Sequence, residues 1–474
     1  MRRLSSILNP QSSIRRPAGP RSWIPGRQLR AMQRDAMSFL RRVAREYGDI
    51  SHFTFGPQHV YLVNHPDLIH DVLVRYGRSF QKGRALQRTK VILGEGLLTS
   101  EGELHKRQRR LAQPAFHRER IARYAEVMID RATRLAGRWR DGQELDIHHE
   151  MMRVTLSVVA KTLFNADVDE EADEIGASLT ELMQMFPILI TPFGEYLRLL
   201  PLPRTRRFEA ALKRLDKTIF DIIEERRRSG RDEGDLLSML LLAQDEEEGG
   251  GGMTDSQVRD EAMTLFLAGH ETTANALSWT WYVLSRNEDA ERRMHEELDA
   301  VLGGRTPTPA DYPRLPFTEM VLAESMRLYP PAWGMGRLAI EDVQLGEWMV
   351  PKGAVVIVAP AVTHLDGRWW PDPLRFDPLR FTPEAKAARP RMAYFPFGAG
   401  TRICIGESFA WMEGVLILAT LAQRWRVRVL EEPRPQASIT LRPRGGMKAV
   451  ILRREDAEGS VPILRDTDPS LRSG

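Results

Sequence analysis

The sequence predicts a mainly α-helical protein with small β-sheets, folded as a single large domain. Apolar residues recur at helical spacing across residues 124–242, so several helices in series are expected there. Two short stretches, residues 52–63 and 343–357, alternate in the manner of strands instead. The 474 residues contain no internal repeat, no Pro/Ser-rich linker and no sustained change of composition. One large unit therefore fits better than the roughly three domains that length alone would suggest.

The first 34 residues differ in composition from the rest of the chain. They contain eight arginines, four prolines and no acidic residue. They lack the apolar core of a secretory signal peptide. We expect residues 1–30 to form a basic, proline-containing arm, residues 31–455 the folded domain, and residues 456–474 a polar tail. An organellar transit peptide, or a weak contact with anionic lipid, would fit the same arginine-rich composition.

Overall composition narrows the class of protein. Charged residues make up 28% and hydrophobic residues 42%, which is ordinary globular usage with enough apolar material for a core. The net charge of +4 is small for this size, so no nucleic-acid partner is expected. A single cysteine excludes an intrachain disulfide and suits a reducing compartment. No apolar run approaches the ~20 residues of a transmembrane helix. A soluble, cytoplasmic protein without a transmembrane segment is predicted.

Turn residues divide the strand-like stretches. Gly56 and Pro57 separate two alternating runs in residues 52–63, which predicts a β-hairpin. Gly346 and the Pro351-Lys-Gly353 sequence punctuate residues 343–357 in the same way. Residues 244–252 form an acidic run that ends in four glycines, and they predict a flexible surface connection within the domain.

A long helix should begin directly after that connection. Thr254 and Gln257 have the spacing of a capping box. The helix continues through Leu-Phe-Leu-Ala-Gly-His-Glu-Thr-Thr-Ala-Asn at residues 265–275, where a glycine and two threonines each cost several tenths to about 1 kcal/mol of helix stability. The threonine hydroxyls can bond to carbonyls of the preceding turn and bend the helix. Taken alone, this stretch fits a buried bent helix as well as a functional one.

Two charged residues share one face of a later helix. Glu324 and Arg327 lie at positions i and i+3 of a helix predicted over residues 318–329, which Pro330 and Pro331 end. Such a pair on a surface contributes at most a few tenths of a kcal/mol. The pattern alone is therefore weak evidence for function.

The single cysteine, Cys404, lies in Phe-Gly-Ala-Gly-Thr-Arg-Ile-Cys-Ile-Gly at residues 397–406, followed by an apolar helical pattern that begins near Glu407. Most free cysteines are small buried hydrophobes. Glycines on both sides, however, let the backbone approach a flat cofactor closely. A thiol just before a helix N-terminus should favour its ionised form, which is the form that binds metals.

Residues 397–406 match the pattern FxxGxRxCxG and resemble the haem-binding loop of the cytochrome P450 family. The five matching residue types are Phe397, Gly400, Arg402, Cys404 and Gly406. The resemblance extends over roughly residues 30–455 and implies the cytochrome P450 fold. It also implies a haem b cofactor in contact with Phe397, with Cys404 as the thiolate ligand of the iron.

Two further segments resemble this family and follow in the family's order. Residues 265–275 resemble the helix that crosses the distal face of the haem, so Thr272 would hydrogen-bond dioxygen or its water and Glu271 would help to supply protons. Arg380, in Phe-Asp-Pro-Leu-Arg-Phe at residues 376–381, resembles the arginine that completes a cluster with Glu324 and Arg327. The resemblance assigns that cluster a structural role.

Haem carries two propionates, which require cations at one edge of the cofactor. Arg402, Arg337, His105 and Arg109 match the family positions that supply them. Many relatives have tryptophan where His105 stands. For each arginine, a solvated surface position is the alternative.

The resemblance implies a haem-thiolate monooxygenase that inserts one oxygen atom from O₂ into a C–H bond of a lipophilic small molecule. A fatty acid, an alkane or a terpenoid is the expected substrate, because the two variable walls of the pocket are apolar. These walls are residues 182–193 and residues 82–98. Ordinary core packing would explain the same apolar residues. A peroxygenase or isomerase is an alternative that the Glu271–Thr272 pair disfavours. A non-catalytic haem-binding sensor is a second alternative. Such a sensor usually couples the haem to a signalling domain, and no second domain is visible in the sequence.

Electrons should come from a separate protein, because no flavin or iron–sulfur module is visible in the sequence. We expect a ferredoxin-type or flavodoxin-type donor with its reductase. Lys106, Arg107 and Arg110 could form a basic face for an acidic donor. A merely solvated helix face is the alternative.

Overall fold

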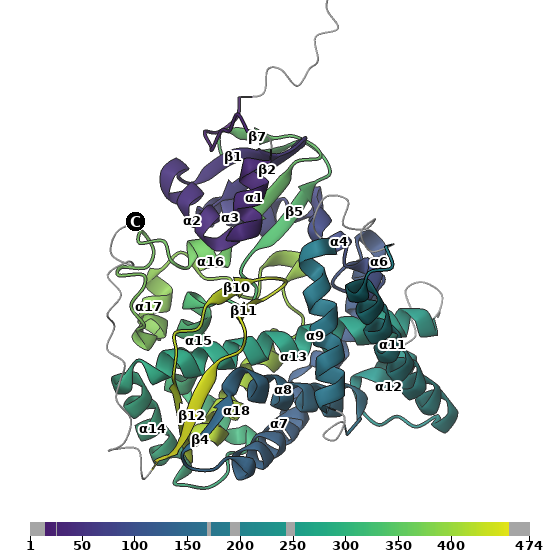
Figure 1. Cartoon of the computed structure of the whole chain (residues 1–474), viewed down its shortest axis with the longest axis vertical. Coiled ribbons are helices and arrows are strands. Elements are labelled where there is room, and N and C mark those ends of the chain that lie inside the picture. The colour runs from purple at the N-terminus through teal and green to yellow at the C-terminus, as the bar shows by residue number, and fades with distance from the viewer. Residues whose placement is uncertain (1–14, 25, 168–171, 190–199, 243–251, 455–474) are drawn as a thin grey trace, which may run out of the picture.

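The computed structural model describes residues 15–24, 26–167, 172–189, 200–242 and 252–454. It has a large helical body that carries a smaller lobe, built around strands, at one end (Figure 1). Helix α13 (Asp255–Ser285) runs through the middle of the body. The predicted tail at residues 456–474, most of the acidic connection and residues 190–193 of the predicted pocket wall lie outside the described residues.

The lobe contains a five-stranded sheet of order β1-β2-β8-β5-β3. The predicted hairpin is confirmed: β1 (Ile50–Phe55) and β2 (Gln58–Val63) pair antiparallel around Gly56, whose φ is +60°. The second predicted β region is confirmed as β6 (Val343–Leu345), β7 (Trp348–Val350) and β8 (Val355–Val358). The remaining strands are β3 (Phe80–Lys82), β4 (Gln143–Asp146), β5 (Met335–Ala339), β9 (Trp425–Val429), β10 (Pro435–Ala437), β11 (Leu441–Pro443) and β12 (Lys448–Arg453).

Helices account for most of the body, and the predicted series across residues 124–242 is confirmed. None of the helices in the described part of the chain is long and apolar enough to cross a membrane. The helices besides α13 are α1 (Arg27–Arg34), α2 (Ala36–Tyr47), α3 (Pro66–His70), α4 (Arg84–Gln87), α5 (Lys90–Leu93), α6 (Gly102–Ala112), α7 (Arg118–Arg138), α8 (Ile147–Phe164), α9 (Ala172–Leu189), α11 (Pro203–Ser229), α12 (Leu236–Leu242), α14 (Glu288–Leu302), α15 (Pro316–Leu328), α16 (Pro360–Thr363), α17 (Pro383–Ala388) and α18 (Glu407–Ala422).

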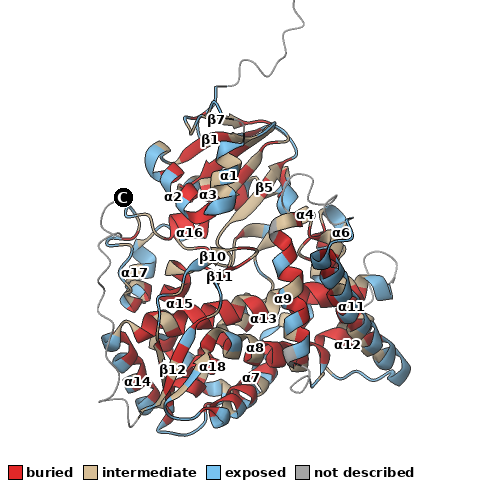
Figure 2. Cartoon of the chain, in the orientation of Figure 1, coloured by how far each residue is buried: buried red, intermediate tan, exposed pale blue. Residues whose placement is uncertain are grey.

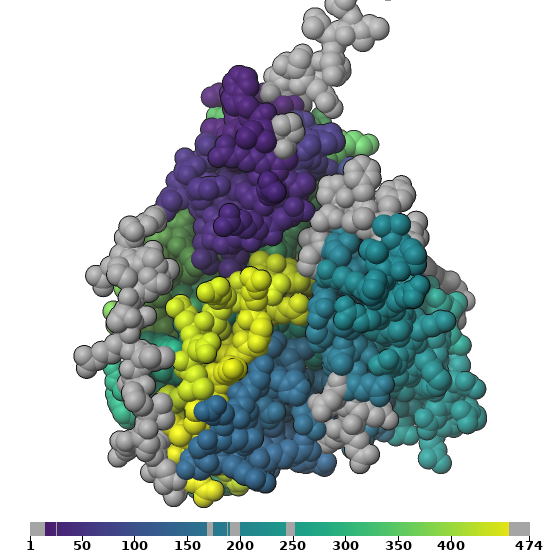
Figure 3. All heavy atoms as spheres, viewed as in Figure 1, coloured from purple at the N-terminus to yellow at the C-terminus, as the bar shows by residue number. Residues whose placement is uncertain are grey.

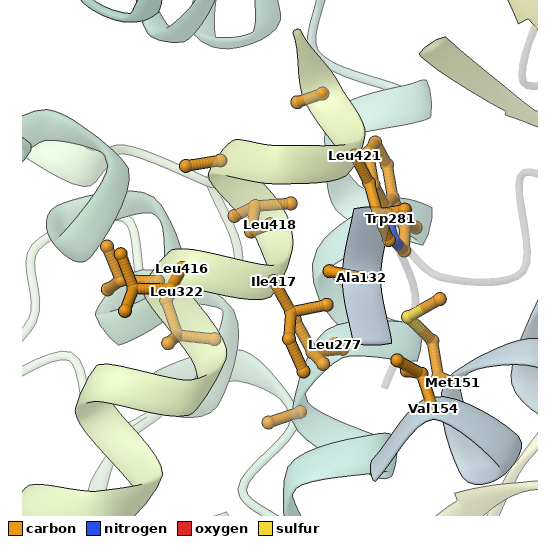
Figure 4. Close-up of a cluster of buried hydrophobic side chains, with 14 of the residues drawn as sticks. Ala132, Met151, Val154, Leu277, Trp281, Leu322, Leu416, Ile417, Leu418 and Leu421 are labelled. Atoms are coloured by element: carbon orange, nitrogen blue, oxygen red, sulfur yellow. The ribbon is translucent and has the colours of Figure 1, made fainter. Parts of the chain in front are cut away.

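Helix α13 begins at the predicted capping box. The Thr254 hydroxyl accepts a hydrogen bond from the Gln257 N–H at 3.3 Å, and the Gln257 side chain accepts one from the Thr254 N–H at 3.0 Å. The helix then stays buried on most sides along its length (Figure 2). Its C-terminal half packs with α8 and α18 in one apolar cluster, which includes Leu277, Trp281 and Ile417 (Figure 4). This packing fixes the position of the whole helix in the body.

The described part of the predicted basic arm lies on strand β1. Ala18 accepts a hydrogen bond from the His52 N–H at 3.1 Å, and Pro17 is buried. A Cβ at Gly19 would lie 1.8 Å from the His52 carbonyl oxygen, so only glycine fits there. Helix α1 begins at Arg27, within the residues predicted as arm.

Candidate functional site

The segment that carries Cys404 is a tight turn between the 3₁₀ turn η9 (Gly400–Arg402) and α18. The Cys404 N–H donates to the Phe397 carbonyl at 3.0 Å, and Arg109 Nη1 donates to the Ile403 carbonyl at 2.7 Å. Gly400 has a φ of +72°, and a Cβ there would lie 2.1 Å from the Leu73 carbonyl oxygen. A glycine at position 400 is therefore required for the turn to close against Leu73.

Cys404 is accessible to solvent, although many protein atoms surround its thiol. Burial raises the pKa of its thiol to about 11, while the Gly406 N–H and Arg109 act in the opposite direction. The expectation that the neighbouring helix N-terminus would favour the thiolate is wrong for the free side chain, because desolvation outweighs it. A metal cation would supply the missing stabilisation of the thiolate.

One face of α13 is partly exposed in an otherwise buried helix. Ala268 and Thr272 share this face, because they are spaced by four residues, whereas a Cβ at Gly269 would lie 3.0 Å from the Val159 side chain. The Thr272 hydroxyl donates to the Ala268 carbonyl at 2.7 Å, and the Thr273 hydroxyl donates to the Gly269 carbonyl at 3.3 Å. The predicted hydroxyl-to-carbonyl bonds are thus confirmed. The exposed face borders space that protein atoms do not fill.

Glu271 points in a different direction from Thr272. Its Oε1 accepts a hydrogen bond of 2.6 Å from the hydroxyl of Thr440, which lies just before β11. Burial raises the pKa of the Glu271 carboxyl, and Thr440 and Arg442 lower it. Within the described residues, no hydrogen bond joins the Glu271 and Thr272 side chains. Thr440 lies 169 positions away in sequence and carries no motif, so sequence reasoning missed it.

Two of the predicted cofactor-binding arginines lie close to β3. Arg402 Nη2 pairs with Glu101 Oε2 at 2.5 Å, and Arg402 Nη1 donates to the Phe80 carbonyl at 2.8 Å. Arg337 is buried on β5, directly across from Lys82 on β3. Burial and the charge of Arg402 lower the pKa of Arg337 to about 10. The structure therefore brings Arg337 and Arg402 into one charged cluster.

His105 joins the same cluster through a lysine that the motifs did not single out. Lys82 is buried and donates through Nζ to the carbonyls of Leu97 at 2.8 Å and Ser100 at 2.7 Å. The same Nζ lies 3.3 Å from His105 Nδ1. Burial lowers the pKa of Lys82 to about 7 and that of His105 to about 4. Lys82 is the first residue of the predicted pocket wall at residues 82–98. Its positive charge is the only feature of the sequence that could have marked it as part of the cofactor site.

The cluster has the donor groups that two propionates require. His105 Nδ1 lies 3.1 Å from the Leu97 carbonyl oxygen and 3.3 Å from Lys82 Nζ, and His105 Nε2 is buried with no hydrogen-bond partner among the described residues. Two carboxylates act on the cations Lys82, Arg337 and Arg402: Glu101, and Glu261, whose pKa burial raises to about 7. Arg109 lies between this group and the thiol, and its pKa is lowered by burial and raised by Cys404. These residues fit a dianionic cofactor that lies against Cys404.

The predicted cluster of Glu324, Arg327 and Arg380 is present and buried. Arg327 donates to both carboxylate oxygens of Glu324, at 2.6 and 2.7 Å, and Arg380 Nε lies 3.5 Å from Glu324 Oε1. Arg327 also donates to the His364 carbonyl at 2.9 Å, and His364 Nε2 accepts from the Phe395 N–H at 3.0 Å. The cluster thereby connects α15 to the segment that leads into the cysteine turn.

Two other predicted groups lie at the edges of the site. The Phe397 ring is partly exposed and packs 5.6 Å from the Trp411 ring between centroids. On α6, Lys106 and Arg110 are exposed, and Lys106 Nζ pairs with Glu103 Oε1 at 2.6 Å. The basic side chains predicted for a partner therefore lie on the same helix as His105 and Arg109.

Comparisons with known proteins agree with this geometry. The family model for cytochrome P450 matches residues 17–448. Cyclooctatin synthase from Streptomyces melanosporofaciens is 42% identical over 87% of this chain and 91% of its own length. Cyclooctat-9-en-7-ol 5-monooxygenase from the same organism is 38% identical, over 84% of this chain and 86% of its own length. Pentalenene oxygenase from Streptomyces avermitilis is 37% identical, over 84% and 88% respectively.

A solved structure supports the fold. The crystal structure of the cytochrome P450DA heme domain matches with a TM-score of 0.83, at 24% identity, over 93% of this chain and 98% of that one. The family model and the relatives each cover most of the chain. The chain belongs to the cytochrome P450 family of haem-iron monooxygenases.

Proposed function

We propose that this protein is a cytochrome P450 that hydroxylates a terpenoid skeleton, and that Cys404 would hold haem b through its thiolate. The observation that carries the proposal is the exposed Cys404 thiol beside a buried cationic cluster. A thiol that desolvation keeps protonated when free needs a metal cation to become a thiolate. Lys82, His105, Arg109, Arg337 and Arg402 would hold the two propionates.

Bound thiolate-ligated haem supplies the oxidising chemistry that inserts one atom of O₂ into an unactivated C–H bond. The protein supplies the protons. Thr272 donates its own hydroxyl proton to the Ala268 carbonyl, so its oxygen lone pairs remain available to accept a hydrogen bond on the exposed face of α13. Glu271, whose pKa burial raises and whose Oε1 accepts a hydrogen bond from Thr440, can give up a proton and regain it.

The substrate class rests on apolar surroundings and on the relatives. Two relatives are named for cyclooctat-9-en-7-ol and pentalenene, an alkenol and an alkene by name. Of the three substrate classes expected from the sequence, the terpenoid fits these names best. The described part of the wall at residues 182–189 packs into the core with Leu265 and Phe266 of α13, so core packing accounts for it. Partly exposed Leu98 and Ile439 at the edge of the same cluster are better candidates for contact with substrate.

Electrons would come from a separate ferredoxin-type or flavodoxin-type donor with its reductase. Exposed Lys106 and Arg110, on the helix that also carries His105 and Arg109, offer an acidic donor a docking face near the cofactor.

The test has three steps. The purified protein, reduced under CO, should show the absorption band of a thiolate-ligated haem, and Cys404→Ser should abolish it. Titration with terpene hydrocarbons and with fatty acids should change the iron spin state for the terpenes only. Turnover should require a ferredoxin, its reductase and O₂. A band that survives in Cys404→Ser would contradict the ligand assignment, and turnover with peroxide alone would favour the peroxygenase alternative.

A further inference from the structure

The oxidation chemistry leaves the arginine-rich N-terminal arm unexplained. Its described part starts at the tip of the strand-containing lobe, far along the chain from Cys404 (Figure 3, darkest purple). Arg15, Arg16 and Arg21 are exposed, and the segment from 15 to 24 contains no acidic residue. The contacts of Pro17, Ala18 and Gly19 with β1 fix this segment in place, so its cations are presented from a defined surface.

The arm also exposes large apolar side chains. Trp23 is fully exposed and Ile24 is 63% exposed. An exposed tryptophan beside arginines is typical of protein surfaces that lie in the interface of a membrane, where the ring sits among the lipid headgroups. Trp23 follows Arg16 by seven positions, so the Cα atoms of these two residues lie within roughly 25 Å of each other even in a fully extended chain.

A cationic pocket adjoins Arg16. It has a volume of about 340 Å³ and is lined by Arg16, Arg84, Lys352, His59 and Gln58, with no acidic residue in its lining. None of the three cations forms an ion pair with another described residue. Two acidic residues interact with neighbours of the pocket cations but do not pair with the cationic side chains themselves. Glu347 pairs with Arg15 at 3.9 Å, and Asp342 accepts a hydrogen bond from the Lys352 backbone N–H at 2.7 Å.

The histidines beside the pocket support its positive character. His52 Nε2 and His59 Nδ1 share a hydrogen bond of 2.9 Å. Burial, His59 and Arg16 lower the pKa of His52 to about 4, so positive charge is already unfavourable there. The positive charge of Arg16 contributes to the lowered pKa of both His52 and His59, so its field reaches the lining of the pocket.

We propose that the segment from Arg15 to Ile24 and this pocket form a docking surface for an anionic lipid membrane, with a lipid phosphate in the pocket and Trp23 in the headgroup layer. The inference is independent of the proposed substrate.

The test is sedimentation of the full chain with vesicles of phosphatidylcholine alone or with 30% phosphatidylglycerol. Binding should occur only to the anionic vesicles and should weaken with salt, since exposed charges are screened. Each cation removed should lower the partition coefficient about fivefold. The triple variant R16A/R84A/K352A should therefore bind on the order of a hundredfold more weakly. W23S should weaken binding severalfold and leave its salt dependence unchanged.

The matched control removes the same charge elsewhere. Lys213, Lys386 and Lys448 are exposed on α11, α17 and β12, and K213A/K386A/K448A should bind as the parent does. Equal losses in the two triple variants, or no binding to anionic vesicles, would overturn the proposal. Calorimetry with glycerol 3-phosphate distinguishes a free phosphate ligand: tight binding of that molecule by a protein that ignores vesicles would also overturn it.

Discussion

The carboxyl of Glu271 is fully buried, and one hydroxyl holds it. Its hydrogen bond to Thr440 joins α13 to the segment before β11, and burial raises its pKa. The adjacent Thr272 lies on the partly exposed face of the same helix. A proton donor and a hydrogen-bond acceptor therefore stand at neighbouring positions in different environments. The two side chains should contribute separately to turnover.

Replacing Thr440 should change the pH dependence of turnover more than its maximum. Thr440 lowers the pKa of Glu271, so Thr440→Val should raise that pKa and move the alkaline limb of the kcat profile upward by about one pH unit. Thr440→Ser keeps the hydroxyl and should leave the limb in place. Glu271→Gln should remove the limb and lower kcat about a hundredfold. Identical profiles for the valine and serine variants would contradict this role.

Lys82 should affect cofactor retention. Its Nζ lies among the side chains proposed to hold the propionates, and burial has lowered its pKa to about 7. Two propionates nearby would favour the charged form. Lys82→Met should therefore release haem roughly tenfold faster, measured as transfer to a haem-scavenging apoprotein. Lys90→Met, at an exposed lysine, is the control and should release haem at the parental rate.

Among the elements, α15 and α18 each carry a buried acid in contrasting surroundings. Glu324 of α15 pairs with Arg327, and both side chains are inaccessible to solvent. Glu413 of α18 packs close to Thr273 of α13 without any cation, and burial raises its pKa to about 8. The first acid is held by charge and connects elements around the cysteine turn. The second is stabilised in the protonated state.

The two arginines around Glu324 should differ in their effect on stability. Arg327→Ala leaves a buried carboxylate without its bidentate partner and should cost about 3–5 kcal/mol of unfolding free energy. Arg380 is 12% exposed and lies 3.5 Å from the same carboxylate, so Arg380→Ala should cost about 1 kcal/mol. Urea unfolding at pH 7 measures both. Equal losses would show that the two arginines share the charge of Glu324 evenly.

Glu413 should make the protein less stable as pH rises. Because its folded pKa is above its unfolded value of about 4.5, the folded state binds the extra proton, and stability is lost as pH rises from about 4.5 to 8. The side chain in Glu413→Gln stays neutral. Between pH 6 and pH 8 the unfolding free energy of this variant should therefore fall by about 2–3 kcal/mol less than that of the parent protein. Urea unfolding at the two pH values is the measurement. Parallel losses in both proteins would contradict a raised pKa.

For the whole molecule, two regions with exposed basic groups have different proposed partners. The arm starts at the tip of the lobe and α6 lies on the helical body (Figure 1). The cationic pocket adjoins Arg16 of the arm, and α6 carries the exposed Lys106 and Arg110. The net charge of +4 conceals this separation. Charge changes in one region should leave the function of the other intact.

Reversing Lys106 and Arg110 to glutamate should slow turnover that an acidic ferredoxin drives, and it should weaken the salt dependence of that turnover. A loss of about tenfold in kcat/KM at low salt is expected, and it should disappear at high salt. Vesicle binding should be unchanged. Unaltered rates and unaltered salt dependence would contradict docking at this face.

The sequence by itself determined the family, the helical class, the hairpin, the capping box and the order Glu271, Glu324, Arg380, Cys404, because these features are local patterns of fixed spacing. Only the tertiary structure decided which groups meet. Lys82 contacts His105 and Thr440 contacts Glu271 through chain segments that no short motif links. The ionisation of Cys404 also depended on the fold, because burial raises the thiol pKa against the effect expected from the neighbouring helix. Desolvation depends on every segment packed around a group, so no local pattern encodes it.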